Sequence, residues 1–396
     1  MYSRYVYLPS LLSLLFFVLA QSAIAKPLKV FILCGQSNME GHAQTKTFLA
    51  IAKDPKTKEL YEDMVDKDGK PVVCDKVWVS YAYGNFSGDP IGTKSGKLTA
   101  GYGSQHHIGT GKIGPEFTFG IYMQKMLGEP ILLIKTAWGG KSLQVDFRPP
   151  SGGKLPESAS DKTKQKAGIY YKIMMDHVKK VLADPKKAYP GYDSKEGYEL
   201  AGFVWFQGFN DLVGNYPRMA AVKGKKASKD YSEYSRLLAC FIRDVRKDLK
   251  ADKLPFVIGV LGVDGKTEEE GMWAFRKAMA APAKLAEFKD TVTAVYTENY
   301  WPAELDKVLA KVKPFKDEQR VKEREFKKQD KTGAELQKLR KEYAKIVQAK
   351  IEKALTPDDV FLLEHGISNR GFHYYGSAKF FAQLGKAFAE ALLPQK

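Results

Sequence analysis

Short apolar runs alternate with amphipathic segments along most of this chain. Six runs have the length and the β-branched or aromatic content of strands: 30–34, 76–81, 130–137, 201–206, 255–261 and 291–296. Helical periodicity marks five further segments: 114–127, 170–182, 230–249, 272–288 and a last one that ends at Leu393. Because strands that alternate with helices form parallel βαβ units, we expect an α/β protein with one parallel sheet of five or six strands.

Residues 42–112 are polar and predict loops, interrupted by the strand at 76–81. Asp66 to Gly69 resembles part of a calcium loop, but Met64 occupies the first ligand position, which indicates a plain turn. His106 and His107 are adjacent, and neighbouring side chains point apart on a strand or a helix. The sequence therefore predicts no metal site here.

A strongly charged segment interrupts the α/β pattern between residues 304 and 355. It is rich in Lys, Glu, Gln, Arg and Ala, and Pro314 and Gly333 divide it into two or three expected helices. One face carries apolar side chains at helical spacing: Leu336, Leu339, Tyr343, Ile346, Val347 and Ile351. We expect an inserted helical arm packed on the main domain. Its charge marks either a solvated surface or a surface that binds a partner.

The N-terminal residues have the layout of a secretory signal peptide. Arg4 precedes an apolar stretch at 8–20, and Ala23-Ile24-Ala25 offers a small-residue cleavage site, so cleavage is expected after Ala25. The alternative is an uncleaved N-terminal anchor. No later stretch is long and apolar enough to cross a bilayer.

These boundaries predict a signal peptide at 1–25, a first part of the main domain at 26–303, the helical insertion at 304–355 and a last part of the main domain at 356–396. The protein is expected to be secreted or periplasmic.

The formal net charge is +17, of which the leader contributes one positive charge through Arg4. This balance suits acidic surroundings such as an anionic polysaccharide; we do not expect nucleic acid as a partner. Cys34 lies in an apolar run and is expected to act as a small hydrophobe, whereas a Cys74–Cys240 disulfide stays open. No zinc-type cysteine spacing occurs, and no cofactor is expected.

Polar residues of the kind needed for acyl transfer follow three of the expected strands. Ser37 follows the first strand, Gly140 the strand at 130–137, and Asn210 the strand at 201–206. Parallel strands bring their carboxyl ends to one edge of the sheet. There Ser37 could attack a carbonyl, the N–H groups and the Asn210 amide could bind the oxyanion, and His373 could take the proton. The plainer interpretation of Ser37 alone is a helix N-cap.

The motifs around these residues resemble the sialate O-acetylesterase-like branch of the SGNH hydrolases, which includes acetylxylan esterases. The resemblance rests on Gly35-Gln-Ser-Asn-Met39, Trp138-Gly-Gly140, Trp205-Phe-Gln-Gly-Phe-Asn-Asp211 and the late His373. It implies a three-layer α/β/α, flavodoxin-like SGNH hydrolase fold, with the charged segment as an insertion. It also implies Ser37 as nucleophile, His373 as base, and Gly140 and Asn210 as oxyanion donors. Four further residues in or near these motifs are candidates for substrate binding: Gln36, Glu116, Gln207 and Asp211.

Two positions depart from the family pattern. Many members have an aspartate three residues before the histidine, where this chain has Arg370, and some have a glutamate where this chain has Phe209. The group that orients His373 is thus open between Asp211, Glu298, Glu364 and a backbone carbonyl, and a Ser–His dyad is a further option. Met39 also excludes the G-x-S-x-G elbow of α/β-hydrolases.

The leading functional hypothesis is an exported serine esterase that removes O-acetyl groups from carbohydrate without a metal or organic cofactor. Aromatic residues near the strand ends could stack on sugar rings or pack the core: Trp138, Phe209, Tyr216 and Trp301. One alternative is a catalytically weak or inactive carbohydrate-binding protein on the same fold. Another is a protein whose basic arm binds a polyanion.

Overall fold

The computed structural model describes residues 26–85, 87–105, 111–218, 229–329 and 332–393. A seven-stranded sheet lies at its centre, in the order β3-β2-β4-β1-β5-β6-β7. The strands are β1 (Leu28–Gly35), β2 (Cys74–Gly84), β3 (Pro90–Leu98), β4 (Ile131–Ala137), β5 (Tyr198–Phe206), β6 (Phe256–Val260) and β7 (Val292–Tyr296). All neighbours are parallel except β2 and β3. The expected α/β class with a mainly parallel sheet is confirmed.

Strand β3 was not predicted, because its sequence has no apolar run. Most of its residues are polar or glycine, and most of its side chains are exposed. It pairs antiparallel with β2 at the edge of the sheet, where one face and one side remain in contact with solvent. Such an edge strand is formed through backbone hydrogen bonds and leaves little pattern in the sequence.

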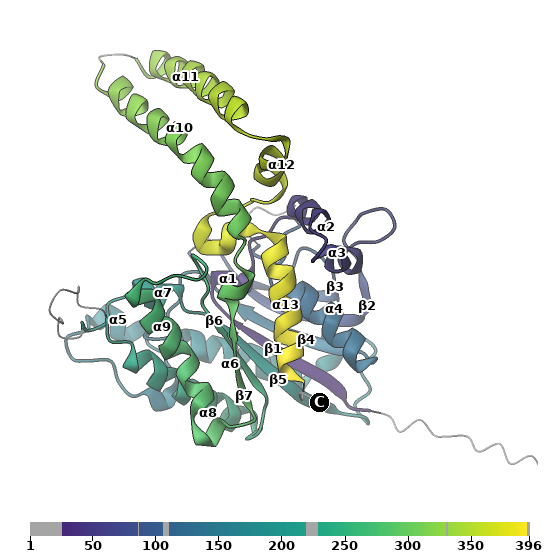
Figure 1. Ribbon diagram of the computed structural model, residues 1–396. Helices are drawn as coiled ribbons and strands as arrows, with labels where there is room; N and C mark the ends of the chain where they lie inside the picture. Colours follow the sequence, from purple (N-terminus) through teal and green to yellow (C-terminus); the bar gives the residue numbers. More distant parts are fainter. Residues whose placement is uncertain (1–25, 86, 106–110, 219–228, 330–331, 394–396) are drawn as a thin grey trace, which may run out of the picture.

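Helices cover both faces of the sheet (Figure 1). One face carries α4 (Glu116–Leu127) and α13 (Ala378–Leu392). The other carries α6 (Ile169–Ala183), α8 (Ser232–Leu249) and α9 (Glu270–Ala280). This is the three-layer α/β/α arrangement of the SGNH-like fold. Residues 42–112 hold more structure than loops alone, since α2 (Leu49–Lys53) and α3 (Lys58–Met64) lie there beside β2 and β3. The motif at Asp66 to Gly69 is a turn, as expected.

The central strand β1 ends level with both of its neighbours. Gly35 pairs with Ala137 of β4 and with Phe206 of β5. A Cβ atom at Gly35 would lie 2.1 Å from the backbone oxygen of Phe206, so only glycine fits at this close approach. The three segments that follow β1, β4 and β5 therefore leave the sheet side by side, at the edge where ligands bind in open α/β folds.

The charged segment forms a helical hairpin that projects away from the sheet (Figure 1). It consists of α10 (Ala303–Lys327) and α11 (Gly333–Ala354), which pack on each other around a small apolar cluster of Val312, Val347 and Ile351. Two expectations were wrong in detail. Pro314 lies inside α10 and does not end it, and Ile346 is exposed and takes no part in the buried face. Among the described residues the hairpin packs on itself and on α12 (Pro357–His365), and it projects from the main domain (Figure 1), contrary to the expectation that it packs on that domain.

Within the described residues, no helix has the length and apolar character that a membrane span requires. Cys34, Cys74 and Cys240 are all free thiols. Cys34 is buried in β1, with its sulfur 3.2 Å from that of Met174, as expected of a small apolar side chain. The signal-peptide prediction for residues 1–25 lies outside the described residues.

Candidate active site

Ser37 is the first residue of α1 (Ser37–Glu40), a single turn that follows β1 directly. The N-cap position of this turn is Gln36, and no side chain makes a capping hydrogen bond there. Ser37 itself is half-buried. Ser37 is therefore not the N-cap of this helix.

The loop after β4 lies against Ser37. Trp138 N donates to Gly35 O at 3.2 Å, and a Cβ atom at Gly139 would lie 3.6 Å from the Ser37 Cβ. Gly140 follows with φ +75°, a conformation that favours glycine. The two glycines thus bring backbone next to the serine. Gly139, which was not predicted as an oxyanion donor, lies nearer to Ser37 than Gly140 does.

Gln36 holds the side chain of Asn210 in a defined orientation. The amide of Gln36 is buried, and its hydrogen-bond partners assign which end is nitrogen. Its Nε2 donates to Asn210 Oδ1 at 2.8 Å and to Lys141 O at 3.2 Å, and its Oε1 accepts from Phe209 N at 3.2 Å. Because Asn210 Oδ1 is occupied in this way, the Nδ2 of Asn210 is directed elsewhere as a donor. Asn210 lies in α7 (Phe209–Val213), which follows β5.

Asp211 fastens the loop after β4 to α7. Its carboxylate accepts from Leu143 N at 2.8 Å, Gln144 N at 3.0 Å, Gln207 Nε2 at 2.5 Å and Tyr216 Oη at 2.8 Å. Burial raises the pKa of Asp211, and the four donors oppose that shift. The carboxylate is used for structure, and it does not orient His373.

The partner of His373 is Asn369. The His373 Nδ1 lies 3.0 Å from Asn369 Oδ1, and the same oxygen accepts from Arg370 N at 2.8 Å. A backbone N–H can only donate, so the atom facing both groups is the amide oxygen, and Nδ1 must carry the imidazole proton. The proton-free nitrogen is then Nε2, the one needed by a general base.

The three acids considered from the sequence are engaged elsewhere. Glu298 pairs with the buried Arg276, Asp211 is bound as described, and Glu364 is an exposed residue of α12. Among the described residues none of them contacts His373. Asn369 was not predicted, because no family motif marks it and this amide, four residues before His373, meets the ring only through the fold of the 371–376 turn.

His373 is held as a neutral imidazole. Its ring stacks on that of His42, with centroids 3.9 Å apart and planes 4° from parallel. Burial is the main cause that lowers the pKa of His373 to about 2, and electrostatic repulsion from His42, Lys112 and Arg370 contributes to the same shift. The Nε2 of His42 in turn lies 3.6 Å from the buried carboxylate of Glu40. At neutral pH the imidazole of His373 is therefore unprotonated, which is the form that a general base needs before the reaction.

A hydrogen bond ties the histidine segment to the serine segment. Asn38 Nδ2 donates to the carbonyl oxygen of Phe372 at 3.2 Å, although the two residues are 334 positions apart. The Phe372 ring also lies 5.6 Å from that of Phe209. The structure thus brings Ser37, the two glycines, Asn210 and His373 to one edge of the sheet.

Glu116 lies in the core and has no substrate-facing surface. Its carboxylate accepts from Lys135 Nζ at 2.6 Å and from Gly114 N at 2.9 Å. Lys135 also donates to the carbonyls of Glu40 and Tyr102. This fully buried ion pair thus supports the turn Ser37–Glu40 through the hydrogen bond from Lys135 to the Glu40 carbonyl. Gln36, Gln207 and Asp211 are also buried, so we revise all four residues from substrate contacts to supports.

The four aromatic residues considered for sugar stacking differ in exposure. Trp138 and Tyr216 are core residues, and Trp301 packs edge-on against Tyr374 and beside Tyr375. Phe209 is half-buried beside the site. Only Phe209 among them is placed to touch a ligand near Ser37.

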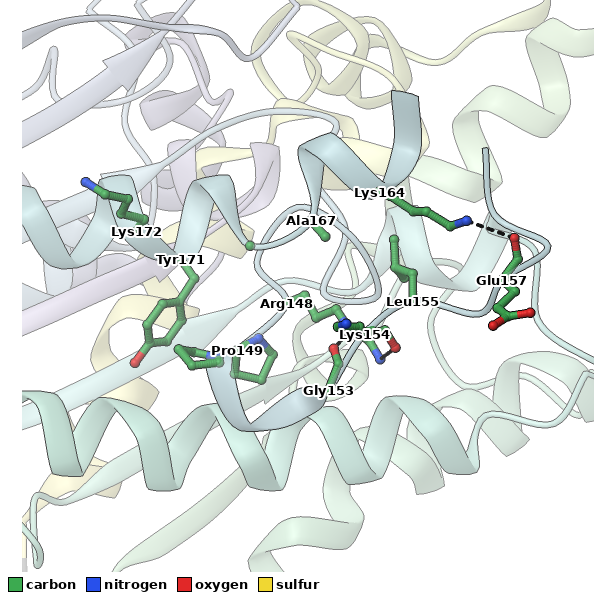
Figure 2. A pocket seen from close by; sticks show the side chains of 12 residues that line it. Arg148, Pro149, Gly153, Lys154, Leu155, Glu157, Lys164, Ala167, Tyr171 and Lys172 are labelled. Atoms are coloured by element: carbon green, nitrogen blue, oxygen red, sulfur yellow. Dashed lines mark hydrogen bonds between the residues drawn. The ribbon is translucent and has the colours of Figure 1, made fainter. Parts of the chain in front are cut away.

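A cavity of about 670 Å³ lies apart from these residues, between the loop after β4 and α6 (Figure 2). Arg148 forms part of its wall, and its guanidinium donates to the carbonyls of Gln144, Gly152 and Gly153. It also pairs with Glu233. The donors of Arg148 thus stabilise the loop, and this cavity has no candidate catalytic group.

Among the residues that the structure describes, no group of three His, Cys, Asp or Glu side chains is placed to hold a metal ion. His106 and His107 lie outside them.

The fold and the converging motifs define an SGNH-type hydrolase of the sialate O-acetylesterase-like branch. The chain belongs to the family described as carbohydrate esterase, sialic acid-specific acetylesterase, whose model matches residues 27–300. Membership places the protein among carbohydrate acetylesterases, a class of carboxylic ester hydrolases.

Other comparisons add little to this assignment. No curated protein matches the chain. Two similar solved structures are a protein from Arabidopsis thaliana (16% identity, 68% of this chain, 86% of that chain, TM-score 0.39) and a carbohydrate acetylesterase from Xanthomonas citri (15% identity, TM-score 0.38). The second match covers 67% of this chain and 49% of that one, so this chain spans about half of its length.

Proposed function

We propose that this protein is an exported serine esterase that removes O-acetyl groups from carbohydrate, with Ser37 as nucleophile and His373 as general base. The observation that carries the proposal is the neutral imidazole of His373, with its Nδ1 proton held by Asn369, on a segment bound to the turn that begins at Ser37. In this tautomer the Nε2 of His373 is free of a proton, as the atom that receives a proton from a serine hydroxyl must be.

The reaction would proceed through an acetyl-enzyme. Ser37 Oγ attacks the acetyl carbonyl carbon while its proton passes to His373 Nε2. The oxyanion is stabilised by backbone N–H groups at Gly139 or Gly140 and by the Asn210 amide. Collapse breaks the bond to the sugar oxygen, which takes the proton from His373. Water, deprotonated by the same nitrogen, then attacks the acetyl-enzyme, and acetate leaves with Ser37 restored.

Asn369 would take the place that an aspartate has in many related enzymes. It holds the correct tautomer through a neutral hydrogen bond, but it adds no negative charge to stabilise the imidazolium that forms during the reaction. We propose a Ser–His–Asn arrangement in place of a Ser–His–Asp triad or a bare dyad.

The test is acetate release from acetylated glycans and from p-nitrophenyl acetate by the mature protein. Ser37→Ala and His373→Ala should abolish release, and Asn210→Ala should lower kcat by about 100- to 1,000-fold. The matched control is Ser194→Ala, which removes an exposed hydroxyl from the loop before β5.

Labelling with a serine-reactive phosphonate separates the enzyme from the alternative of an inactive carbohydrate-binding protein. The enzyme should be labelled at Ser37, and the label should be absent in Ser37→Ala. If no substrate releases acetate and the wild-type protein resists labelling, the binding protein becomes the better interpretation.

A further inference from the structure

A groove of about 1080 Å³ begins at Phe209, the residue before the candidate oxyanion donor Asn210. It lies between α7 and the start of α9, which are close together in Figure 1. Phe209 lines the groove with its side chain, and its backbone N–H is held by Gln36 beside Ser37. Its ring also meets Phe372, the residue before His373. Phe209 thus connects the groove with the segments that carry Ser37 and His373.

The apolar side chains of the groove are unusually accessible. Trp273 of α9 is 45% exposed and Val213 of α7 is 60% exposed, and Leu212 and Phe209 lie between them and the site. A tryptophan side chain exposed to water in a concave surface is unfavourable, and it is typical of a ligand contact. Lys277 lies 5.1 Å from the Trp273 ring centroid, which keeps the indole oriented.

The polar groups around this apolar floor are mostly carboxylates. Among the described residues that line the groove, Asp264 and the consecutive Glu268, Glu269 and Glu270 are exposed carboxylates, and the cations are Arg218 and Lys229. The Nζ of Lys229 is turned inward and donates to the carbonyls of Leu212 and Gly214. The described lining of the groove thus carries more carboxylates than cations, although the whole chain has a net charge of +17.

We infer that this groove, the Trp273 groove, binds neutral sugar units of the same glycan whose acetyl group occupies the active site. The inference rests on the proposed function. A sugar ring presents C–H groups that pack on an aromatic face and hydroxyls that donate to carboxylates, which is the combination that the groove offers. Uronic-acid or sulfated units would meet like charge there. The basic character of the chain as a whole thus does not describe its substrate.

The test compares substrates that do and do not reach the groove. For Trp273→Ala, kcat/KM on an acetylated neutral xylo-pentasaccharide should fall about tenfold, as for loss of one aromatic anchor. The value on p-nitrophenyl acetate, which occupies only the active site, should stay unchanged. Trp273→Phe should recover most of the loss, and Ile91→Ala on the edge strand β3 serves as the control for an exposed apolar residue. Unfolding temperature checks that Trp273→Ala is folded.

Charge selectivity provides the second readout. Glu268→Lys should raise activity on an acetylated galacturonic-acid oligosaccharide relative to the neutral one. Three results would overturn the inference. They are equal losses in Trp273→Ala on the pentasaccharide and on p-nitrophenyl acetate, no loss on either of these substrates, and a wild-type preference for the anionic oligosaccharide. If the wild type hydrolyses neither ester, the proposed function fails. Calorimetric titration of a deacetylated xylo-pentasaccharide into wild type and Trp273→Ala then decides the groove alone: weaker binding in the variant supports it, and equal or absent binding overturns it.

Discussion

Replacing Asn369 should change both the rate and the pH dependence of the reaction, because this amide holds the Nδ1 proton of His373. In Asn369→Ala the imidazole loses one neutral hydrogen bond of about 0.5–1.5 kcal/mol. If that orientation is used in the transition state, kcat should fall by about 2- to 13-fold, while KM stays near its wild-type value.

Asn369→Asp makes the opposite test. The wild-type pKa of His373 is lowered to about 2, so the imidazole stays neutral and His373 should produce no acid limb in kcat/KM above pH 4. A carboxylate at hydrogen-bond distance stabilises the imidazolium and should raise the pKa by about 1–3 units. The acid limb should then move upward, and kcat near pH 7 should be retained or increased.

The assay is initial-rate hydrolysis of p-nitrophenyl acetate between pH 4 and 8, with unfolding temperature as a check on folding. Asn215→Asp is the matched control, since it adds the same charge at an exposed position after α7. If both Asn369 variants keep the wild-type kcat and the wild-type pH profile, Asn369 does not orient the base and the Ser–His–Asn assignment is wrong.

Three further predictions concern the site and its supports. Gln36→Leu should lower kcat about tenfold with little change in KM, because the oxyanion donor Asn210 loses the partner that orients it; steady-state kinetics measures this. Asp211→Ala leaves four donors without their acceptor and should reduce the free energy of unfolding by roughly 3 kcal/mol, measured by urea denaturation. Folding lowers the pKa of His373, so below about pH 6.5 the unfolded chain binds a proton that the folded chain does not, and the free energy of unfolding decreases as the pH is lowered. Between pH 7 and pH 4.5 the wild type should therefore lose roughly 2–3 kcal/mol more than His373→Gln, measured by urea denaturation.

The hairpin yields a prediction of the same kind for the polyanion alternative. Its apolar cluster is separate from the main core, so replacing residues 320–341 by a short turn should leave the unfolding temperature of the main body and esterase kinetics unchanged. The base must stay, because Asp306 accepts hydrogen bonds from Trp301 and Tyr375. If salt-sensitive binding to an anionic polymer persists after this truncation, residues 320–341 are not the polyanion-binding element.

Local pattern accounts for most of the fold that could be predicted from the sequence. Six of the seven strands and the main helices were predicted, because a buried strand needs a continuous apolar run and a surface helix needs an apolar stripe. The edge strand β3 has neither and was missed. Pro314 was expected to end a helix, but packing of α10 on α11 and α12 holds the helix through it.

The site divides in the same way. Their residue types and their place after strands made Ser37, Gly140 and Asn210 candidates from the sequence, because chemistry at a strand end is encoded locally, and the resemblance to the family added His373. The residues that orient these four groups could not be predicted from the sequence. Only the tertiary structure decided that Asn369 faces the histidine.

Burial was likewise decided by the tertiary structure. It placed Glu116 in an ion pair with Lys135 beneath the serine turn, and it joined Phe209 to Trp273 in one groove. A sequence states the chemistry of each side chain and the period of each segment. Which side chains meet depends on where segments hundreds of residues apart are packed together, and that is set by the whole core.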